Sequence, residues 1–249
     1  MATATLPRTT AESVRRGRRN DSIFFSVIAV LILATVFAGF ARTYFLAGMF
    51  RAHLPSTIIH VHGALFSLWV LLLIAQTSLV SAGRTDVHRR LGVAGFGVAC
   101  LMLVFGVLAG TNSLSRNFTP PRFPFDARTF YAIPLGDMLI FATLIFFAYR
   151  ARRNPATHKR LILIATIGLM DAPTARPPFA AITGRPHMDS LFCVIFLLLV
   201  IAYDLWSMRK IHPATIWAGV FLIVVEQLRI PIGMTGAWHN FAAWAQHLA

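Results

Sequence analysis

The sequence carries very little charge for its length. Only 13% of its 249 residues are Asp, Glu, Lys or Arg, whereas 57% are hydrophobic, and the mean hydropathy is +0.67. A soluble domain normally has about 25% charged residues. The composition therefore excludes an ordinary soluble protein and predicts a chain that crosses a membrane several times.

Cysteine, lysine and the common catalytic motifs are also scarce. The two cysteines, Cys100 and Cys193, both lie in apolar runs, so a disulfide framework is not expected. The P-loop, G-x-S-x-G and H-E-x-x-H motifs are absent. A rhodopsin-like Schiff base needs a lysine within a membrane span, but Lys159 and Lys210 both flank apolar runs.

Seven apolar runs approach or exceed the length of about 20 residues that a membrane-spanning helix needs. They lie at 23–45, 57–82, 91–112, 129–149, 158–180, 188–206 and 213–234. The predicted fold is all-α: a seven-helix transmembrane bundle over 23–234, with a basic tail at 1–22 and an amphipathic outer segment at 235–249. The fifth run is the weakest, because its clean apolar stretch LILIATIGLM ends at Asp171.

The distribution of basic residues predicts the orientation of this bundle. Fifteen of the 23 Lys and Arg residues fall in the segments on the N-terminal side of the membrane, and eight fall on the other side. Basic residues are enriched in cytoplasmic segments, so we expect a cytoplasmic N-terminus and a periplasmic C-terminus. The net charge of +14 then favours contact with anionic lipid headgroups at the cytoplasmic face, not with nucleic acid.

Three acidic residues from three predicted spans lie at a similar depth in the outer half. Asp137, Asp171 and Glu226 are each eight or nine residues from an outer helix end, or about 12–13 Å deep at the helical rise. Charges at this depth are expected to face the bundle interior and to pair. Arg176 and Arg229 follow Asp171 and Glu226 closely and are candidate ligand-binding residues. The carboxylates are candidate catalytic residues, or the whole group is a structural ion-pair cluster.

Histidines near the same outer side extend this candidate site. His60 and His62 open the second span, and His187 opens the sixth. Imidazole together with carboxylate suits zinc or non-haem iron, so these three histidines are the predicted metal ligands. Side chains two positions apart on a helix point about 200° away from each other. We therefore expect only one of His60 and His62, the deeper His62, to face the site.

A second set of histidines lies at the predicted cytoplasmic edge. HRRLGVAG begins at His88 and HKRLILIA begins at His158, at the starts of two helices that run outward. These two histidines are alternative haem ligands. The competing interpretation is that they sit among lipid headgroups beside their basic neighbours.

The segment HVHGALFSLWVLLLIAQTSLVSAGRTDVHRRLG resembles part of uncharacterised bacterial multi-span membrane proteins, which are distantly similar to cytochrome b561-type haem proteins. The resemblance covers roughly residues 57–95. It implies a bacterial inner-membrane location and a haem b or metal cofactor. The b561-like pattern has histidines well inside facing helices, whereas most histidines here lie at helix edges.

Three classes of function remain open, and the sequence does not decide whether the protein is an enzyme. The first is a metal or haem protein with redox or hydrolytic chemistry. The second is a binding or transport protein for an anionic or amphipathic small molecule. The third is a structural subunit of a larger membrane complex or homo-oligomer.

The charge distribution yields a test of the orientation. In a cysteine-free background, a cysteine at position 122 should react with a membrane-impermeant thiol reagent added from the periplasm, and a cysteine at position 152 should not. The reverse labelling pattern would place the carboxylate layer in the cytoplasmic half.

Overall fold

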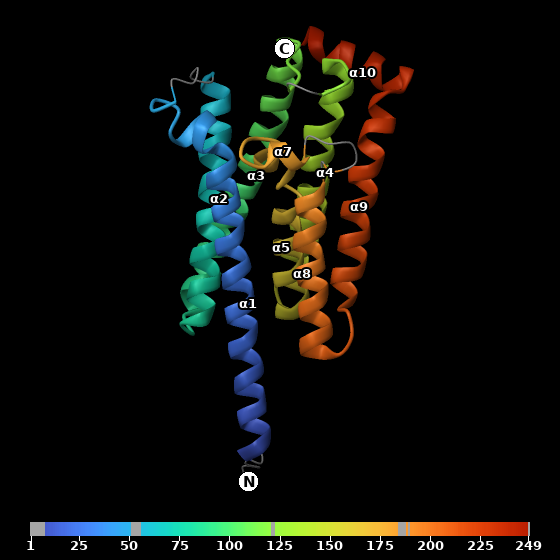
Figure 1. Ribbon diagram of the computed structural model, residues 1–249. Coiled ribbons are helices and arrows are strands. Elements are labelled where there is room, and N and C mark those ends of the chain that lie inside the picture. The colour runs from blue at the N-terminus through green and yellow to red at the C-terminus, as the bar shows by residue number, and fades with distance from the viewer. Residues whose placement is uncertain (1–7, 51–55, 121–122, 184–187, 189, 249) are drawn as a thin grey trace.

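The computed structural model describes residues 8–50, 56–120, 123–183, 188 and 190–248. Within these residues the chain is helical and contains no strand. Figure 1 shows the helices as a bundle with the two chain termini at opposite ends. In order, the elements are α1 (Arg8–Phe40), the π-helical turn η1 (Ala41–Phe45), α2 (Thr57–Ser81), α3 (Thr85–Ser115), α4 (Ala127–Arg150), α5 (Pro155–Ile167), α6 (Asp171–Thr174), α7 (Ala180–Thr183), α8 (Leu191–Met208), α9 (Pro213–Gly233) and α10 (Gly236–His247).

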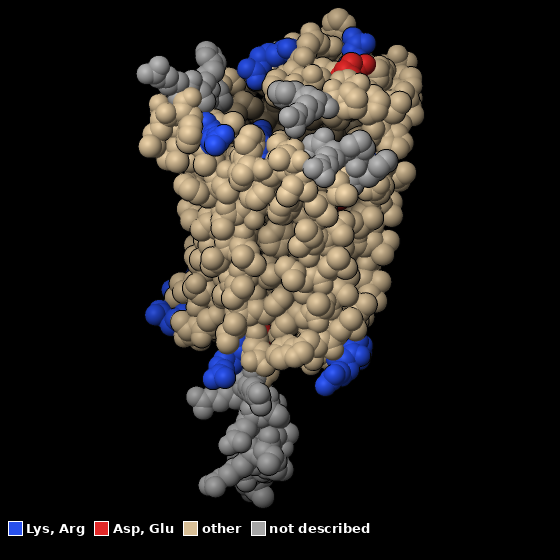
Figure 2. Space-filling view, in the orientation of Figure 1, with Lys and Arg blue, Asp and Glu red and all other residues tan. Residues whose placement is uncertain are grey.

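Six of these helices are long and apolar enough to cross a membrane. They are α1 with η1, counted from Arg19 to Phe45, together with α2, α3, α4, α8 and α9. The view in Figure 2 agrees, because the visible Lys and Arg side chains lie near the two ends of the bundle and the surface between them is almost entirely uncharged. The chain is therefore an integral membrane protein of helical type.

The predicted fifth span, 158–180, is not one continuous helix. The α5 helix begins with Pro155 at its first turn and with the Asn154 side chain accepting a hydrogen bond from the Thr157 amide at 3.3 Å. It ends at Ile167, after 13 residues, because Gly168 lowers helix propensity and Pro173 cannot donate an amide hydrogen bond. At about 1.5 Å per residue, α5 alone is too short to cross the hydrocarbon core.

Side chains replace part of the backbone hydrogen bonding that this break removes. Thr183 Oγ1 donates to the Thr174 carbonyl at 2.7 Å, which Pro178 cannot reach with an amide hydrogen. Thr174 Oγ1 adds a second bond, at 2.8 Å, to the Met170 carbonyl, which also accepts from the Thr174 amide at 3.2 Å. Non-helical backbone at membrane depth is tolerated only where protein buries it or where it lines a cavity. The break is thus held inside the bundle, where α6 presents Asp171 to its neighbours.

A buried ion pair between α5 and α8 lies near the N-terminal end of the bundle. Arg160 and Asp204 are 2% and 0% exposed, and Arg160 Nη2 lies 2.5 Å from Asp204 Oδ1. The other carboxylate oxygen accepts hydrogen bonds from the His212 amide at 3.0 Å and from Thr215 Oγ1 at 2.6 Å. The pair therefore fastens α5 to α8 and to the start of α9. Depth along the helix missed it, because a partner on another helix decides whether a charge near the interface is buried.

The C-terminal helix α10 lies across the end of the bundle opposite the N-terminus (Figure 1). Its Ala242 and Ala245 are buried. Trp238 Nε1 donates to the Arg128 carbonyl at 2.8 Å, and Gln246 Nε2 donates to the Leu114 carbonyl at 3.2 Å. The α10 helix therefore covers the ends of α3 and α4, while Phe241 and Trp244 stay exposed.

The first helix packs directly against the broken segment. Gly39 of α1 faces Pro173 of α6 so closely that a Cβ atom at position 39 would lie 2.8 Å from Pro173 Cβ and would overlap the Pro173 carbonyl. A clash with backbone cannot be relieved by rotating a side chain. The glycine therefore lets α1 hold α6, and with it Asp171, in place.

We expect Gly39→Ala to lower the free energy of unfolding by about 1–3 kcal/mol, the usual cost of overpacking. Gly97→Ala is the matched control, since a Cβ there meets no atom within 4 Å, and alanine should be neutral or slightly stabilising in a helix. Thermal unfolding in detergent measures both. Equal melting temperatures for the Gly39→Ala and Gly97→Ala variants would show that α1 does not pack tightly against α6.

Candidate buried charge site

One arginine joins two carboxylates from different elements in the half of the bundle that holds α10. Arg229 of α9 binds Asp137 of α4, with Nη1 2.6 Å from Oδ1. Its other terminal nitrogen, Nη2, forms an ion pair with Asp171 Oδ2 at the first residue of α6. All three side chains are buried. The guanidinium therefore ties α4, α6 and α9 together.

A cysteine contacts the second of these carboxylates. Cys193 lies in the first turn of α8 and is 0% exposed. Its Sγ is 3.1 Å from Asp171 Oδ1 and also 3.1 Å from the Ile167 carbonyl oxygen, where α5 ends. The single thiol proton can be donated to only one of these two acceptors. Asp171 thus lies between a cation and a thiol.

Glu226 is the carboxylate of this group whose oxygens make no hydrogen bond with the described residues. It lies one turn before Arg229 on α9 and is 3% exposed. Both of its carboxylate oxygens are buried, and neither has a hydrogen-bond partner among the residues that the structure describes. A buried carboxylate without a partner is costly, so Glu226 either holds a proton or faces a cation.

The net charge of the cluster also indicates that it holds a proton or a cation. Asp137, Asp171 and Glu226 bring three carboxylates, and Arg229 brings one positive charge, so two negative charges are in excess when all are ionised. The C-terminal end of α5 adds the partial negative charge of its last carbonyls. Excess negative charge in a low-dielectric interior is unfavourable unless protons or a metal ion offset it.

Three of these residues have the spacing of metal ligands. Donor atoms of Asp171, Cys193 and Glu226 all lie within 4.8 Å of one another, and all three side chains are buried. Within the described chain they form the one group of three or more His, Cys, Asp or Glu side chains with this spacing. Thiolate and carboxylate are both ligands of zinc. The donor set therefore fits a divalent metal ion, with the buried, unpartnered Glu226 as its clearest sign.

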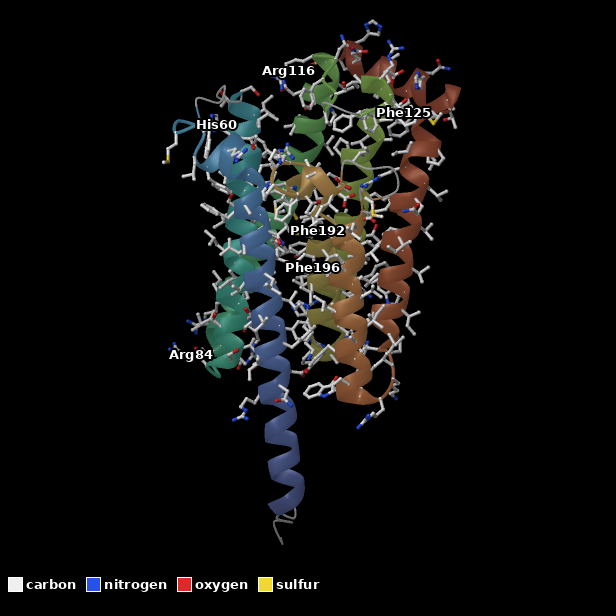
Figure 3. The ribbon with its side chains drawn as sticks, in the orientation of Figure 1. His60, Arg84, Arg116, Phe125, Phe192 and Phe196 are labelled. Atoms are coloured by element: carbon white, nitrogen blue, oxygen red, sulfur yellow. The ribbon has the colours of Figure 1, made fainter. Side chains whose placement is uncertain are left out.

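Two of the three predicted histidine ligands, His60 and His62, do not belong to this group. His60 is exposed, and its backbone carbonyl accepts a hydrogen bond from Tyr44 Oη at 3.1 Å. Figure 3 shows His60 near the end of α2, apart from Phe192 and Phe196 in the middle of the bundle. His62 is half-buried beside Phe66, with ring centroids 4.1 Å apart, and its Nδ1 atom has no partner within the described chain. His187, the third predicted ligand, lies outside the described residues.

The alternative haem ligands lie at the other end of the bundle. His88 is half-buried in the first turn of α3, and its Nδ1 atom is buried without a partner among the described residues. His158 of α5 has its Nδ1 atom 2.8 Å from the Ala148 carbonyl. A proton on that nitrogen leaves Nε2 free to bind a metal, as in many metal-ligating histidines.

The two candidate ligand-binding arginines have different environments. Arg229 is neutralised by two carboxylates, so it has little charge left for an anionic ligand. Arg176 donates to the Ala172 carbonyl and lies over the Phe40 ring, 4.5 Å from its centroid. No carboxylate lies within 4.0 Å of Arg176 in the described part of the chain. The structure therefore joins Arg229 to the acidic cluster and leaves Arg176 against α1.

Sequence reasoning selected the three carboxylates and Arg229 by depth, but it missed Cys193. The depth rule did not select it, because Cys193 lies only five residues from the predicted start of its span at 188, or about 7.5 Å deep at the helical rise. Cysteine is common in apolar cores, so its position carried little weight without knowledge of its neighbours.

We expect Asp171→Ala to destabilise the protein by about 3–5 kcal/mol, the typical loss when one partner of a buried ion pair is removed. Asp137→Asn should cost less, because it keeps the shape and some hydrogen bonding. The control is Asp86→Ala, because the Asp86 and Arg84 side chains that form an ion pair are each 63% exposed. Such an exposed pair should contribute about 0–1 kcal/mol to the free energy of unfolding. Thermal unfolding with a metal chelator present measures all three, and a wild-type melting temperature for Asp171→Ala would contradict the described pairing.

Comparison of the chain with protein-family models, with curated proteins and with solved structures gave no match. The function is therefore argued from the chemistry of the cluster itself.

Proposed function

We propose that this protein crosses the membrane seven times, with α5, α6 and α7 as a broken fifth crossing and with the N-terminus in the cytoplasm. Two features support this topology. The termini lie at opposite ends of the bundle (Figure 1), which requires an odd number of crossings, and six helices are of spanning length. The excess of basic residues on the N-terminal side favours the cytoplasmic assignment. A bacterial inner membrane is the location that goes with this proposal.

We further propose that the buried charge site binds a divalent metal ion of the zinc or iron class. Asp171, Cys193 and Glu226 would be its ligands, and Arg229 with Asp137 would hold Asp171 in position. The observation that carries this proposal is Glu226, whose two buried oxygens have no hydrogen-bond partner in the described chain and which lies within ligand distance of Cys193 and Asp171. A divalent ion would offset the two excess negative charges.

The composition of the ligand set suggests the kind of chemistry. Structural zinc sites are usually closed by four protein ligands, whereas catalytic sites keep three and leave a position for water or substrate. When bound, a metal ion there would act as a Lewis acid on a bound water or substrate. The protein's own contribution is to exclude water, through the burial of the three ligands, and to fix Asp171 through the bond from Arg229.

The other two classes of function, anion binding or transport and a purely structural role, have less support in the structure. Transport of an anion would use Arg176 and Arg229, but the charge of Arg229 is taken up by Asp137 and Asp171. A purely structural cluster would be expected to pair each buried carboxylate, and Glu226 is unpaired within the described residues.

Titration with Co²⁺ tests the proposal, since a thiolate bound to cobalt gives an intense charge-transfer absorption band. Purified protein in mild detergent should develop this band and saturate at one equivalent. Cys193→Ser should abolish the band, whereas Cys100→Ser should keep it, because Cys100 is exposed on another helix. Glu226→Gln keeps the side-chain shape but should weaken binding by more than the 10–100-fold that loss of an outer-shell partner causes.

Two results would refute the metal proposal. Absence of the band in the wild-type protein, together with an unchanged or higher melting temperature for Glu226→Gln, would indicate a protonated structural cluster. A haem absorption spectrum in the purified protein that is lost in His88→Ala or His158→Ala would instead favour the alternative haem pair.

A further inference from the structure

An open groove lies between α4, α5 and α9 near the N-terminal end of the bundle, away from the buried charge site. It has a volume of about 550 Å³ and is lined by Phe147, Arg150, Ala151, Thr157, Leu161 and Trp217. None of these residues is acidic. The groove is thus a separate feature, built where the α4–α5 turn meets the beginning of α9.

The basic residue of the groove is free to bind an anion. Arg150 is the last residue of α4 and is exposed, and within the described chain no hydrogen bond, ion pair or aromatic contact engages its guanidinium. Its neighbour Arg152, by contrast, donates to the Tyr149 carbonyl at 3.1 Å and lies over the Tyr149 ring. Thr157 adds a half-buried hydroxyl at the first turn of α5.

The polarity of the groove changes with depth in the membrane. Arg150 and Thr157 lie at the ends of their helices. Phe147 lies three residues further into the bundle on α4, or about 4.5 Å deeper at the helical rise. Phe147 and Trp217 are 45% and 37% exposed and pack edge to face with ring centroids 5.4 Å apart, and Leu161, 1% exposed, forms the floor. The groove is therefore polar at the interface and apolar further in.

We propose that this groove binds an anionic glycerophospholipid of the surrounding leaflet. The phosphate would lie on Arg150 and Thr157, and the upper part of an acyl chain would lie along Phe147, Trp217 and Leu161. Arg152 and Arg153 in the same turn raise the local positive potential, which favours an anionic headgroup over a zwitterionic one. A tryptophan such as Trp217 is also typical of the membrane–water interface. A soluble anion would use the basic end alone, whereas a phospholipid matches both ends of the groove.

The experiment compares lipids and variants in the full-length protein. Native mass spectrometry in detergent, with added phosphatidylglycerol or phosphatidylcholine, counts the lipids retained, and thermal unfolding reports their stabilising effect. We expect phosphatidylglycerol to be retained preferentially. Arg150→Gln should weaken its binding about fivefold, the effect of one basic side chain near a headgroup, and Trp217→Ala should weaken both lipids.

The matched control is Arg90→Gln, which removes an exposed arginine of α3 that does not line the groove. It should leave the preference for phosphatidylglycerol unchanged. Three results would overturn the proposal: equal retention of the two lipids, equal effects of the Arg90 and Arg150 substitutions, or stabilisation by inorganic phosphate equal to that by phosphatidylglycerol. The last result would indicate a plain anion site.

Discussion

The ion pairs that Arg229 makes with Asp137 and Asp171 determine how the half of the bundle that holds α10 is arranged. Asp137 lies on a continuous helix, whereas Asp171 lies just after the point where α5 stops. A guanidinium can bind two carboxylates at once because its nitrogens form a planar fork. Through that fork the broken segment is fixed to α4 and α9, even though α6 has only four residues and little surface of its own to bury.

The helix break between α5 and α6 and the charged cluster depend on each other. Ending α5 inside the membrane exposes carbonyl groups that water cannot reach, and the thiol of Cys193 lies against one of them. The same break turns Asp171 toward Arg229 and Cys193. A continuous helix through this region would satisfy its own backbone, but it would leave no end of a helix at the depth of the carboxylates.

The two halves of the bundle use buried charge differently. Near the N-terminal end, Asp204 accepts hydrogen bonds from Arg160, Thr215 and the His212 amide, and its pair with Arg160 balances one negative charge with one positive charge. In the other half there are three carboxylates and one arginine. Arg229 pairs with Asp137 and Asp171, and Glu226 has no hydrogen-bond partner in the described chain. A balanced and satisfied pair serves packing. An unbalanced group with an unsatisfied carboxylate is costly to bury, and it is the feature on which the metal proposal rests.

The sequence by itself determined the helical membrane class, the positions of six spans and the common level of Asp137, Asp171 and Glu226, because hydrophobic length and the helical rise are local properties. It also marked the fifth run as weak, since Asp171 and Pro173 interrupt it. Only the tertiary structure decided which charges meet: that Arg160 is buried against Asp204, that Cys193 joins Asp171, and that His60 and His62 stay outside the group of metal-ligand spacing. These outcomes depend on how each helix is rotated and which helices are neighbours, and a sequence pattern along one helix does not specify either.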